Sequence, residues 1–300
     1  MNKNPKVAVI GIGRWGKNIV NTLVKLGFNV SHCFSNGGAE NQDWLKSTHP
    51  QIQFADSYEA ILSDSEIGAV FIATPIITHY LLTRQALEAG KHVFLEKPGT
   101  QSVESMQELC DLAKSKGLIL SVGYVFIHHP AFRYLVEKLK DEGILSINFE
   151  WNKWGSFGEN IVENLLTHDL SILIALAIRI NTDSIQASYK AGIDDDKDDI
   201  INIQCTSVDG IKISSNINRL SPDKRKVITI VTSDNIYIWS NDNLQVARRH
   251  QTNPPISIEI TKTSALDNEL NNFMQAISGE SQIIVHGEFA VPILETIKDL

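Results

Sequence analysis

The first 122 residues alternate short apolar runs with stretches in which apolar residues recur at helical spacing. The apolar runs predict strands at residues 6–10, 28–34, 69–73, 92–95 and 118–122. The other stretches predict helices over residues 15–26, 56–62, 78–89 and 103–116. The second of these helices opens at Asp56 and Glu59, which have the spacing of a capping box. Strands and helices in this alternation predict a parallel sheet covered on both faces.

The pattern changes after Gly123. A helix is predicted at residues 131–140, another at 161–177, and two more at 266–277 and from 289 onward. Strand-like runs dominate between them, at residues 144–154, 185–189, 200–206, 211–217, 227–232, 236–239 and 257–260. Several alternate apolar and polar residues, which is typical of a sheet with one solvated face. We therefore expect an open, mostly antiparallel sheet in a C-terminal α+β domain.

A glycine-rich motif stands between the first predicted strand and the first predicted helix. Its G-x-G-x-x-G residues are Gly11, Ile12, Gly13, Arg14, Trp15 and Gly16. The first glycine allows a tight turn, the second lets backbone approach a pyrophosphate, and the third lets helix and strand pack closely. At the first βα turn this pattern predicts a dinucleotide-binding site, and a purely structural turn is the alternative. The fold class is thus α/β, with a Rossmann doubly wound parallel sheet in residues 1–122 and the α+β domain in residues 123–300.

The end of the second predicted strand bears on the choice between NAD and NADP. An acidic residue usually stands there and binds the ribose hydroxyls. Here residues 33–38 are uncharged, and Ser35 offers a hydroxyl. A 2′-phosphate would meet no carboxylate at this point, although no arginine stands beside it to bind one. NAD and NADP therefore both remain open, and we favour NADP.

Two further segments carry a resemblance to a known family. They are Phe71 to Pro75 with His79, and Ala86 to Pro98, which ends in the motif Glu96, Lys97, Pro98. Together with the glycine motif they resemble the glucose–fructose oxidoreductase, inositol dehydrogenase and MocA family. The resemblance implies hydride transfer between a nicotinamide and a hydroxyl-bearing carbon of a sugar, cyclitol or nucleotide sugar. It also implies assembly into homodimers or homotetramers through the C-terminal sheet.

The resemblance implies a role for each motif residue. Lys97 is the expected catalytic residue, because a lysine at the carboxyl edge of the sheet is able to bond the reacting oxygen and stabilise its charge. A surface lysine at a strand end is the alternative. Five residues of these segments are expected to bind the cofactor: Thr74, Pro75, His79, Glu96 and Lys97.

A second catalytic candidate lies on the predicted helix at residues 161–177. His168 is suited to exchange a proton, and a buried structural histidine is the alternative. Many family members carry an acid four residues before this histidine, whereas Asn164 stands here and relays no proton. The substrate-binding candidates are Tyr124, Trp154, Asn164 and His168, with His128 and His129 as further pocket candidates. A branch linked to polysaccharide and nucleotide-sugar biosynthesis has a similar local sequence.

Composition narrows the range of functions. The 300 residues carry a formal net charge of −8, which argues against a general nucleic-acid binder. No apolar stretch is long enough to span a membrane, and the N-terminus lacks the features of a signal peptide. Cys33, Cys110 and Cys205 stand apart from one another, so we expect a reduced, cytoplasmic protein without a metal site.

Three functions fit these patterns. The first is an NAD(P)-dependent oxidoreductase that acts on a sugar or nucleotide sugar. The second is a cofactor-binding regulator that has lost the chemistry, which Asn164 favours and the retained Lys97 and His168 oppose. The third is a reductase of an imine or a non-sugar carbonyl.

Overall fold

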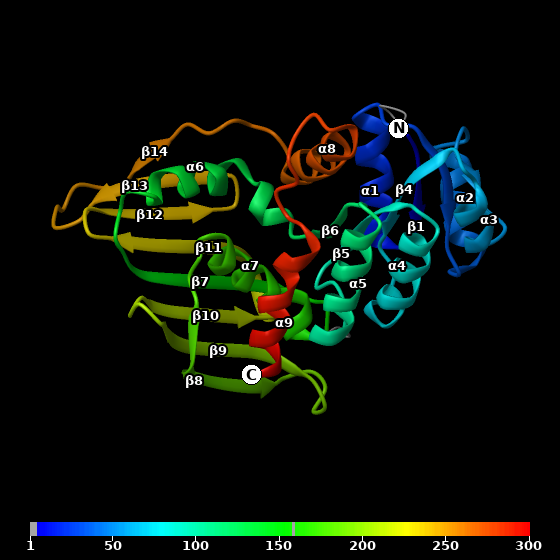
Figure 1. The fold of residues 1–300 in the computed structure, drawn as a ribbon. Helices are drawn as coiled ribbons and strands as arrows, with labels where there is room; N and C mark the ends of the chain where they lie inside the picture. The colour runs from blue at the N-terminus through cyan, green and yellow to red at the C-terminus, as the bar shows by residue number, and fades with distance from the viewer. Residues whose placement is uncertain (1–4, 158–159) are drawn as a thin grey trace. The chain divides into compact units, whose positions relative to one another are not determined.

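The computed structural model describes residues 5–157 and 160–300, and the chain divides into two compact units (Figure 1). The first unit comprises the residues up to Val125 together with Ser264–Leu294. The second comprises Phe126–Thr263 together with Glu295–Leu300. No helix among the described residues is long and apolar enough to cross a membrane.

The first unit is built on a six-stranded parallel sheet of order β3-β2-β1-β4-β5-β6. The strands are β1 (Lys6–Ile10), β2 (Val30–Phe34), β3 (Gln53–Phe54), β4 (Ile67–Ile72), β5 (His92–Glu96) and β6 (Leu120–Gly123). The helices between them are α1 (Arg14–Lys25), α2 (Gly38–Thr48), α3 (Tyr58–Ser63), α4 (His79–Glu88) and α5 (Val103–Ser115). The central strands are buried apolar runs, as expected of a parallel sheet with helices on both faces. The predicted Rossmann sheet is confirmed.

Helix α8 (Ala265–Ser278) belongs to the first unit although it lies far along the chain. Its Phe273 is fully buried, with ring centroids 5.2 Å from Phe71 and 5.6 Å from Phe94. The sequence-based division at residue 123 places this helix in the second domain, whereas the structure groups Ser264–Leu294 with the first unit. The difference arises because apolar periodicity shows that a helix has a buried face but not which sheet buries it.

Two local predictions in the first unit differ from the structure. Ser57, rather than Asp56, caps α3, because its hydroxyl accepts a hydrogen bond from the Ala60 N–H at 3.1 Å. Helix α2 and strand β3 were not predicted. Helix α2 buries only Leu45, so its apolar pattern is weak, and β3 has only two residues.

The second unit is built on an eight-stranded sheet of order β14-β13-β12-β11-β7-β10-β9-β8. Its strands are β7 (Ile144–Trp154), β8 (Ile180–Ala191), β9 (Asp198–Ser207), β10 (Lys212–Asn218), β11 (Leu220–Thr232), β12 (Asn235–Ser240), β13 (Asn243–Arg248) and β14 (Ile256–Ile258). Strands β7 and β10 pair in parallel and the other neighbours are antiparallel, which confirms a mostly antiparallel sheet. The prediction missed β13.

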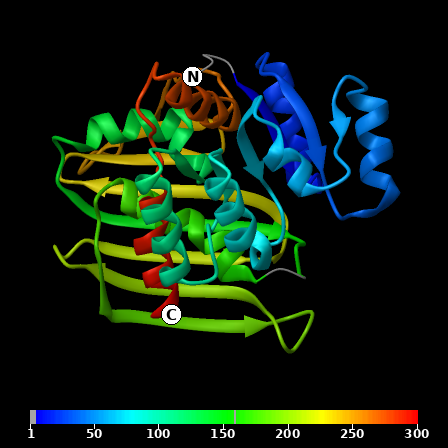
Figure 2. The same ribbon diagram turned by 45° about the vertical axis from the view of Figure 1, so that its right-hand side comes forward.

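Helices α6 (Pro130–Leu139) and α7 (Thr167–Ala175) cover one face of this sheet (Figures 1 and 2). Helix α7 continues a π-helical turn at Val162–Leu166, so the single predicted helix at 161–177 has two parts. The chain ends with a short 3₁₀ turn, Gly287–Ala290, and α9 (Val291–Lys298).

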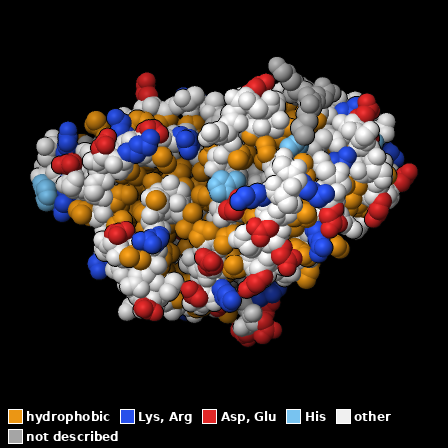
Figure 3. Space-filling model, in the orientation of Figure 1, with side chains coloured by type: hydrophobic (Ala, Val, Ile, Leu, Met, Phe, Trp, Pro, Cys, Tyr) orange, Lys and Arg blue, Asp and Glu red, His pale blue; other side chains and the backbone are white. Residues whose placement is uncertain are grey.

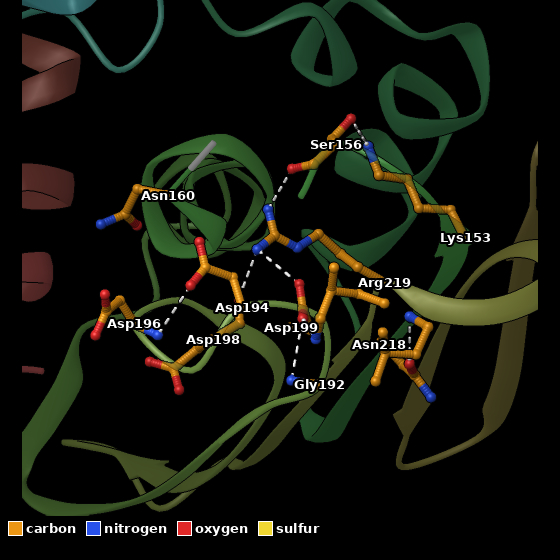
Figure 4. A network of polar contacts seen from close by, with 12 residues as sticks. Lys153, Ser156, Asn160, Gly192, Asp194, Asp196, Asp198, Asp199, Asn218 and Arg219 are labelled. Atoms are coloured by element: carbon orange, nitrogen blue, oxygen red, sulfur yellow. Dashed lines mark hydrogen bonds and ion pairs between the residues drawn. The ribbon is translucent and has the colours of Figure 1, made fainter. Parts of the chain in front are cut away.

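A buried ion pair fixes the loops at one end of the eight-stranded sheet (Figure 4). Arg219 is fully buried and lies 3.1 Å from a carboxylate oxygen of Asp199. Its guanidinium also donates to the carbonyl oxygens of Ser156 and Asp198, each at 2.5 Å. The other Asp199 oxygen accepts from the N–H groups of Gly192 and Ile193. Residues 194–197 form an exposed turn, whereas the buried Asp199 anchors the loop from inside.

The aromatic cluster around Phe273 should contribute strongly to the stability of the first unit. Phe273→Ala should lower the free energy of unfolding by about 3–5 kcal/mol, because a large buried ring is lost and a cavity remains. Urea denaturation of the full chain measures the change. Leu81→Ala on α4, where the leucine is 58% exposed, serves as the control and should change it by less than about 0.5 kcal/mol. Equal effects of the two substitutions would contradict this assignment.

Candidate functional site

The turn after β1 brings the glycine motif against the end of β4. Gly11 has a φ of +87°, and a Cβ atom there would lie 2.7 Å from the Ala73 carbonyl oxygen. A Cβ at Gly16 would lie 1.9 Å from the Gly11 carbonyl oxygen, so only glycine fits. A Cβ at Gly13, in contrast, would meet no atom within 4 Å. The outer side of the turn is therefore open.

Helix α1 begins at this turn. Its N-cap, Gly13, carries no side chain, and its first turn contains no acidic residue. Arg14 and Trp15 are exposed there, whereas Ile12 is buried beneath the turn. Backbone N–H groups and the helix dipole at such an uncapped end favour an anion. The turn therefore fits the pyrophosphate of a dinucleotide.

Three further predicted residues follow strands of the same sheet. Ser35 comes after β2, Thr74 after β4 and Lys97 after β5. Because these strands are parallel, their carboxyl ends lie along one edge of the sheet. Strands β1 and β4 are neighbours at the point where the strand order reverses, which is where open α/β sheets bind ligands. The glycine turn lies at this switch point.

His79 links the segments that follow β4 and β5. Its ring nitrogens lie 2.7 Å from the Gly99 carbonyl oxygen and 2.8 Å from the Thr74 carbonyl oxygen. The imidazole is buried, and this burial is the main cause of its lowered pKa. In the structure His79 therefore holds Thr74 in place, while Pro75 accepts a hydrogen bond from the Thr78 hydroxyl. Direct contact of His79 with a cofactor stays a prediction.

Two buried carboxyl groups interact within the first unit. Glu96, at the end of β5, accepts a hydrogen bond from the Trp15 indole, and burial raises its pKa to about 7. Glu269, on α8, is only 2% exposed, and neither of its oxygens has a hydrogen-bond partner among the described residues. Its pKa is raised well above the ordinary value, first by burial and then by the charge of Glu96. The structure thus disfavours ionisation of both groups at once.

Lys97 is half-buried next to this pair, and its backbone N–H lies 3.3 Å from a Glu96 carboxyl oxygen. Tyr124 supports the same segment, because its fully buried hydroxyl donates to the Pro98 carbonyl oxygen at 3.1 Å. Its ring packs against Phe289. Tyr124 therefore contacts the backbone next to Lys97, and its contact with substrate stays a prediction.

His168 lies in the first turn of α7, between aromatic rings of the second unit. Its imidazole stacks on Trp151 at a centroid distance of 5.4 Å and meets the edge of Phe126 at 4.9 Å. The side chain is buried. Asn164, on the π-helical turn before it, is partly buried. The rings fix the plane of the imidazole, as a proton-exchanging group requires.

The neighbouring Asp169 points to the sheet. Its carboxyl accepts a hydrogen bond from the Ser215 hydroxyl of β10 at 2.8 Å. Burial raises its pKa to about 7, and the charge of Lys226 partly offsets this. Lys226, on β11, has its ammonium over the Phe126 ring and 4.5 Å from the Trp151 ring centroid. Burial lowers the lysine pKa well below its ordinary value.

A cavity of about 600 Å³ adjoins these rings. Its walls combine aromatic and basic side chains, and hydrophobic side chains gather on this face of the second unit (Figure 3). His129 lies at the cavity as the N-cap of α6, with its ring 4.9 Å from that of Trp239. The lining residues are Phe126, His129, Trp151, Lys224, Arg225, Lys226, Ile228, Trp239, Asn241 and Asp242.

The other pocket candidates lie elsewhere. Trp154, at the end of β7, is 61% exposed and packs against Phe157. His128 is buried, and burial together with the charge of Arg133 lowers its pKa to about 3. Neither residue lines the cavity beside His168.

Glu269 and Lys226 were not predicted, although each has a detectable signal in the sequence. Glu269 stands at helical spacing from Leu266 and Phe273, which puts it on the buried face of α8. Lys226 alternates in phase with Ile228 and Ile230, both inward-facing on β11. A charged residue at a core position of a helix or strand is therefore the signal to look for.

The buried carboxyl pair should make stability fall as pH rises. Above about pH 4 the unfolded chain releases a proton from each group that the folded chain retains, so the free energy of unfolding decreases by up to about 1.4 kcal/mol per pH unit and proton. Glu269→Gln removes one such group. Melting temperatures between pH 5 and pH 8 should therefore fall less in this variant than in the wild type. The exposed Glu280→Gln is the control, and identical slopes in all three proteins would refute the assignment.

Comparisons with known proteins support the first unit most directly. Residues 5–124 match the model of the Gfo/Idh/MocA family, described as an oxidoreductase family with an NAD-binding Rossmann fold. A dTDP-3,4-didehydro-2,6-dideoxy-α-D-glucose 3-reductase of Streptomyces violaceoruber is 40% identical over 90 residues, which is 30% of this chain and 26% of that protein. The chain thus covers about a quarter of that relative, and 27% of a second 3-reductase, from Actinomadura kijaniata.

Other similarities extend over both units. A UDP-N-acetylglucosamine 3-dehydrogenase of Acidithiobacillus ferrooxidans is 26% identical over 247 residues, covering 77% of this chain and 76% of that protein. A solved structure of that dehydrogenase has a TM-score of 0.89 at 21% identity, covering 98% of this chain and 96% of the other. An oxidoreductase structure from Desulfitobacterium hafniense has a TM-score of 0.88 at 16% identity, covering 100% and 95%.

The glycine turn, the strand order and the matched segment thus agree. Residues 5–124 are therefore similar to the NAD-binding Rossmann fold of the Gfo/Idh/MocA oxidoreductase family, and the first unit has this fold.

Proposed function

We propose that the protein is an NAD(P)-dependent oxidoreductase that transfers hydride between a nicotinamide and a carbinol or carbonyl carbon of a sugar or nucleotide sugar. The observation that carries this proposal is the open turn at Gly13, at the amino end of α1 and within the segment that matches the family. When bound, the nicotinamide supplies the hydride acceptor or donor. The protein's residues supply binding, orientation and proton transfer.

Lys97 and His168 have different tasks in this reaction. The Lys97 ammonium bonds the reacting oxygen and stabilises the negative charge that develops there. His168 takes the hydroxyl proton in oxidation or returns it in reduction. Its ring is oriented for this by Trp151 and Phe126. Asn164 orients the substrate by its amide and takes no part in proton transfer.

The nature of the substrate is proposed from the relatives and from the cavity. Two relatives have names that place their chemistry at position 3 of a nucleotide-linked sugar. The aromatic walls beside His168 suit the apolar face of a sugar ring, and a cavity of about 600 Å³ accommodates more than one ring. A sugar or nucleotide sugar is therefore favoured over an imine or another carbonyl compound.

A regulator without catalysis is the second candidate. Asn164 favours it, because this side chain relays no proton. Cofactor binding without turnover of any sugar would support it.

We also propose a homodimer or homotetramer formed through the open face of the eight-stranded sheet. That face carries polar side chains, among them Asn148, Glu150, Ser214 and Asn216. The free, buried cysteines suit the reducing cytoplasm that we expect for the protein.

Removal of either catalytic group should abolish most turnover. Lys97→Ala should lower kcat sharply and leave the Kd for NAD(P)H nearly unchanged. His168→Ala should lower kcat by about 10²–10⁴-fold. Reduced nicotinamide is followed spectrophotometrically with nucleotide sugars and free sugars, and the exposed Lys114→Ala serves as the control. Unimpaired turnover in Lys97→Ala would refute the proposed mechanism.

We propose NADP as the preferred cofactor. The Ser35 hydroxyl accepts from the Gly37 N–H at 3.2 Å and from the Asn41 amide at 3.3 Å, and no carboxylate stands among residues 33–38. Ser35→Asp should therefore weaken NADPH binding by about tenfold or more while NADH binding is retained, because the carboxylate repels a 2′-phosphate and accepts from ribose hydroxyls. Fluorescence titration of both cofactors measures this, with Ser35→Ala as the control. Tighter NADH than NADPH binding by the wild type would contradict the preference.

A further inference from the structure

The cavity beside His168 contains a buried lysine that lacks the hydrogen-bond partners its charged form needs. The Lys226 ammonium is buried and has no hydrogen-bond partner among the described residues. An ammonium group carries three N–H donors. Its neighbours are the faces of Phe126, Trp151 and Trp239, which attract a cation but accept no conventional hydrogen bond. The group is thus poised to bind an acceptor that enters the cavity.

Asp169 does not supply this acceptor. Its carboxyl is held by the Ser215 hydroxyl, and no ion pair joins it to Lys226 among the described residues. It acts on Lys226 only through its charge and offsets part of the cost of burial. Asp169 thus has a hydrogen bond that offsets part of the cost of its burial, whereas Lys226 has none within the described part of the chain.

A second lysine lines the same cavity. Lys224 lies two residues before Lys226 on β11 and lines the same cavity, although the whole chain has a formal net charge of −8. Arg225 also lines it, but its guanidinium lies 3.6 Å from a carboxylate oxygen of Glu150. Among the residues that the structure describes, Asp242 is the only acidic one in the lining, and its side chain is 97% exposed. Two lysines at an aromatic cavity favour a ligand with an apolar face and a negative charge.

We infer that this cavity binds the anionic part of the substrate, a phosphate or carboxylate group, and that Lys226 contacts that anion. The inference rests on the proposed function, because it assigns a subsite for the substrate of the same reaction. The anion has two possible sources: the diphosphate of a nucleotide sugar, or a charged substituent on the sugar ring. Trp151 and Trp239 then pack against the uncharged part of the ligand.

Direct binding tests this assignment without turnover or cofactor. Isothermal titration calorimetry is performed on the full chain with glucose, glucose 6-phosphate, glucuronate and UDP. The wild type should bind at least one anionic probe about tenfold or more tightly than glucose. Lys226→Met should remove that advantage and leave glucose binding unchanged. The exposed Lys212→Met on β10 is the matched control and should behave as the wild type.

The probes also distinguish the two sources of the anion. Loss of UDP binding in Lys226→Met assigns the site to the diphosphate, whereas loss of glucose 6-phosphate or glucuronate binding assigns it to a group on the sugar. Thermal unfolding checks the fold, and methionine should not lower the melting temperature, since it replaces an incompletely bonded buried amine.

Three results would overturn the inference: no binding of any anionic probe, equal affinity for glucose and the anions, or unchanged anion binding in Lys226→Met. Failure of the proposed function would instead appear as absence of NAD(P)H binding or of turnover. The two failures are therefore separable.

Discussion

The close approach of Gly16 to the Gly11 carbonyl oxygen determines how the first unit meets a ligand. A Cβ at Gly16 would lie 1.9 Å from that oxygen, so α1 starts against the end of β1 only because the residue is glycine. The amino end of α1 therefore lies at the switch point of the sheet, next to β4. Any other side chain would displace the helix start, and with it the N–H groups that suit a pyrophosphate.

The alternation of the first unit was predictable because its information is local. Buried strands such as β1 and β4 are continuous apolar runs, and glycine places the turn between strand and helix without reference to distant residues. The position of α8 was not predictable in the same way. Its apolar face matches any core, and only the packing of Phe273 against Phe71 and Phe94 assigns it to the first unit.

The candidate site was predictable to a similar degree. The glycine turn and Lys97 could be predicted, because each belongs to a motif that lies within one continuous stretch of the sequence. The neighbours of His168 do not follow, because Trp151 and Lys226 come from two strands that pair only in the folded sheet. Alternation along β11 shows that Lys226 points inward, but not that three aromatic rings surround it.

Glu269 and Lys226 both break the apolar pattern of their elements, yet their surroundings differ. Glu269 faces a second carboxyl, and burial and like charge both oppose its ionisation. Protonation of Glu269 therefore removes most of the cost of burying its charge, and no ligand is needed. Lys226 faces a cavity that Lys224 also lines, so loss of the Lys226 proton leaves a positive neighbour in place. A negatively charged ligand would therefore stabilise the cavity at Lys226, but it would not stabilise the surroundings of Glu269. The two departures from pattern therefore have different consequences: one makes stability depend on pH, and the other makes the second unit selective for charge.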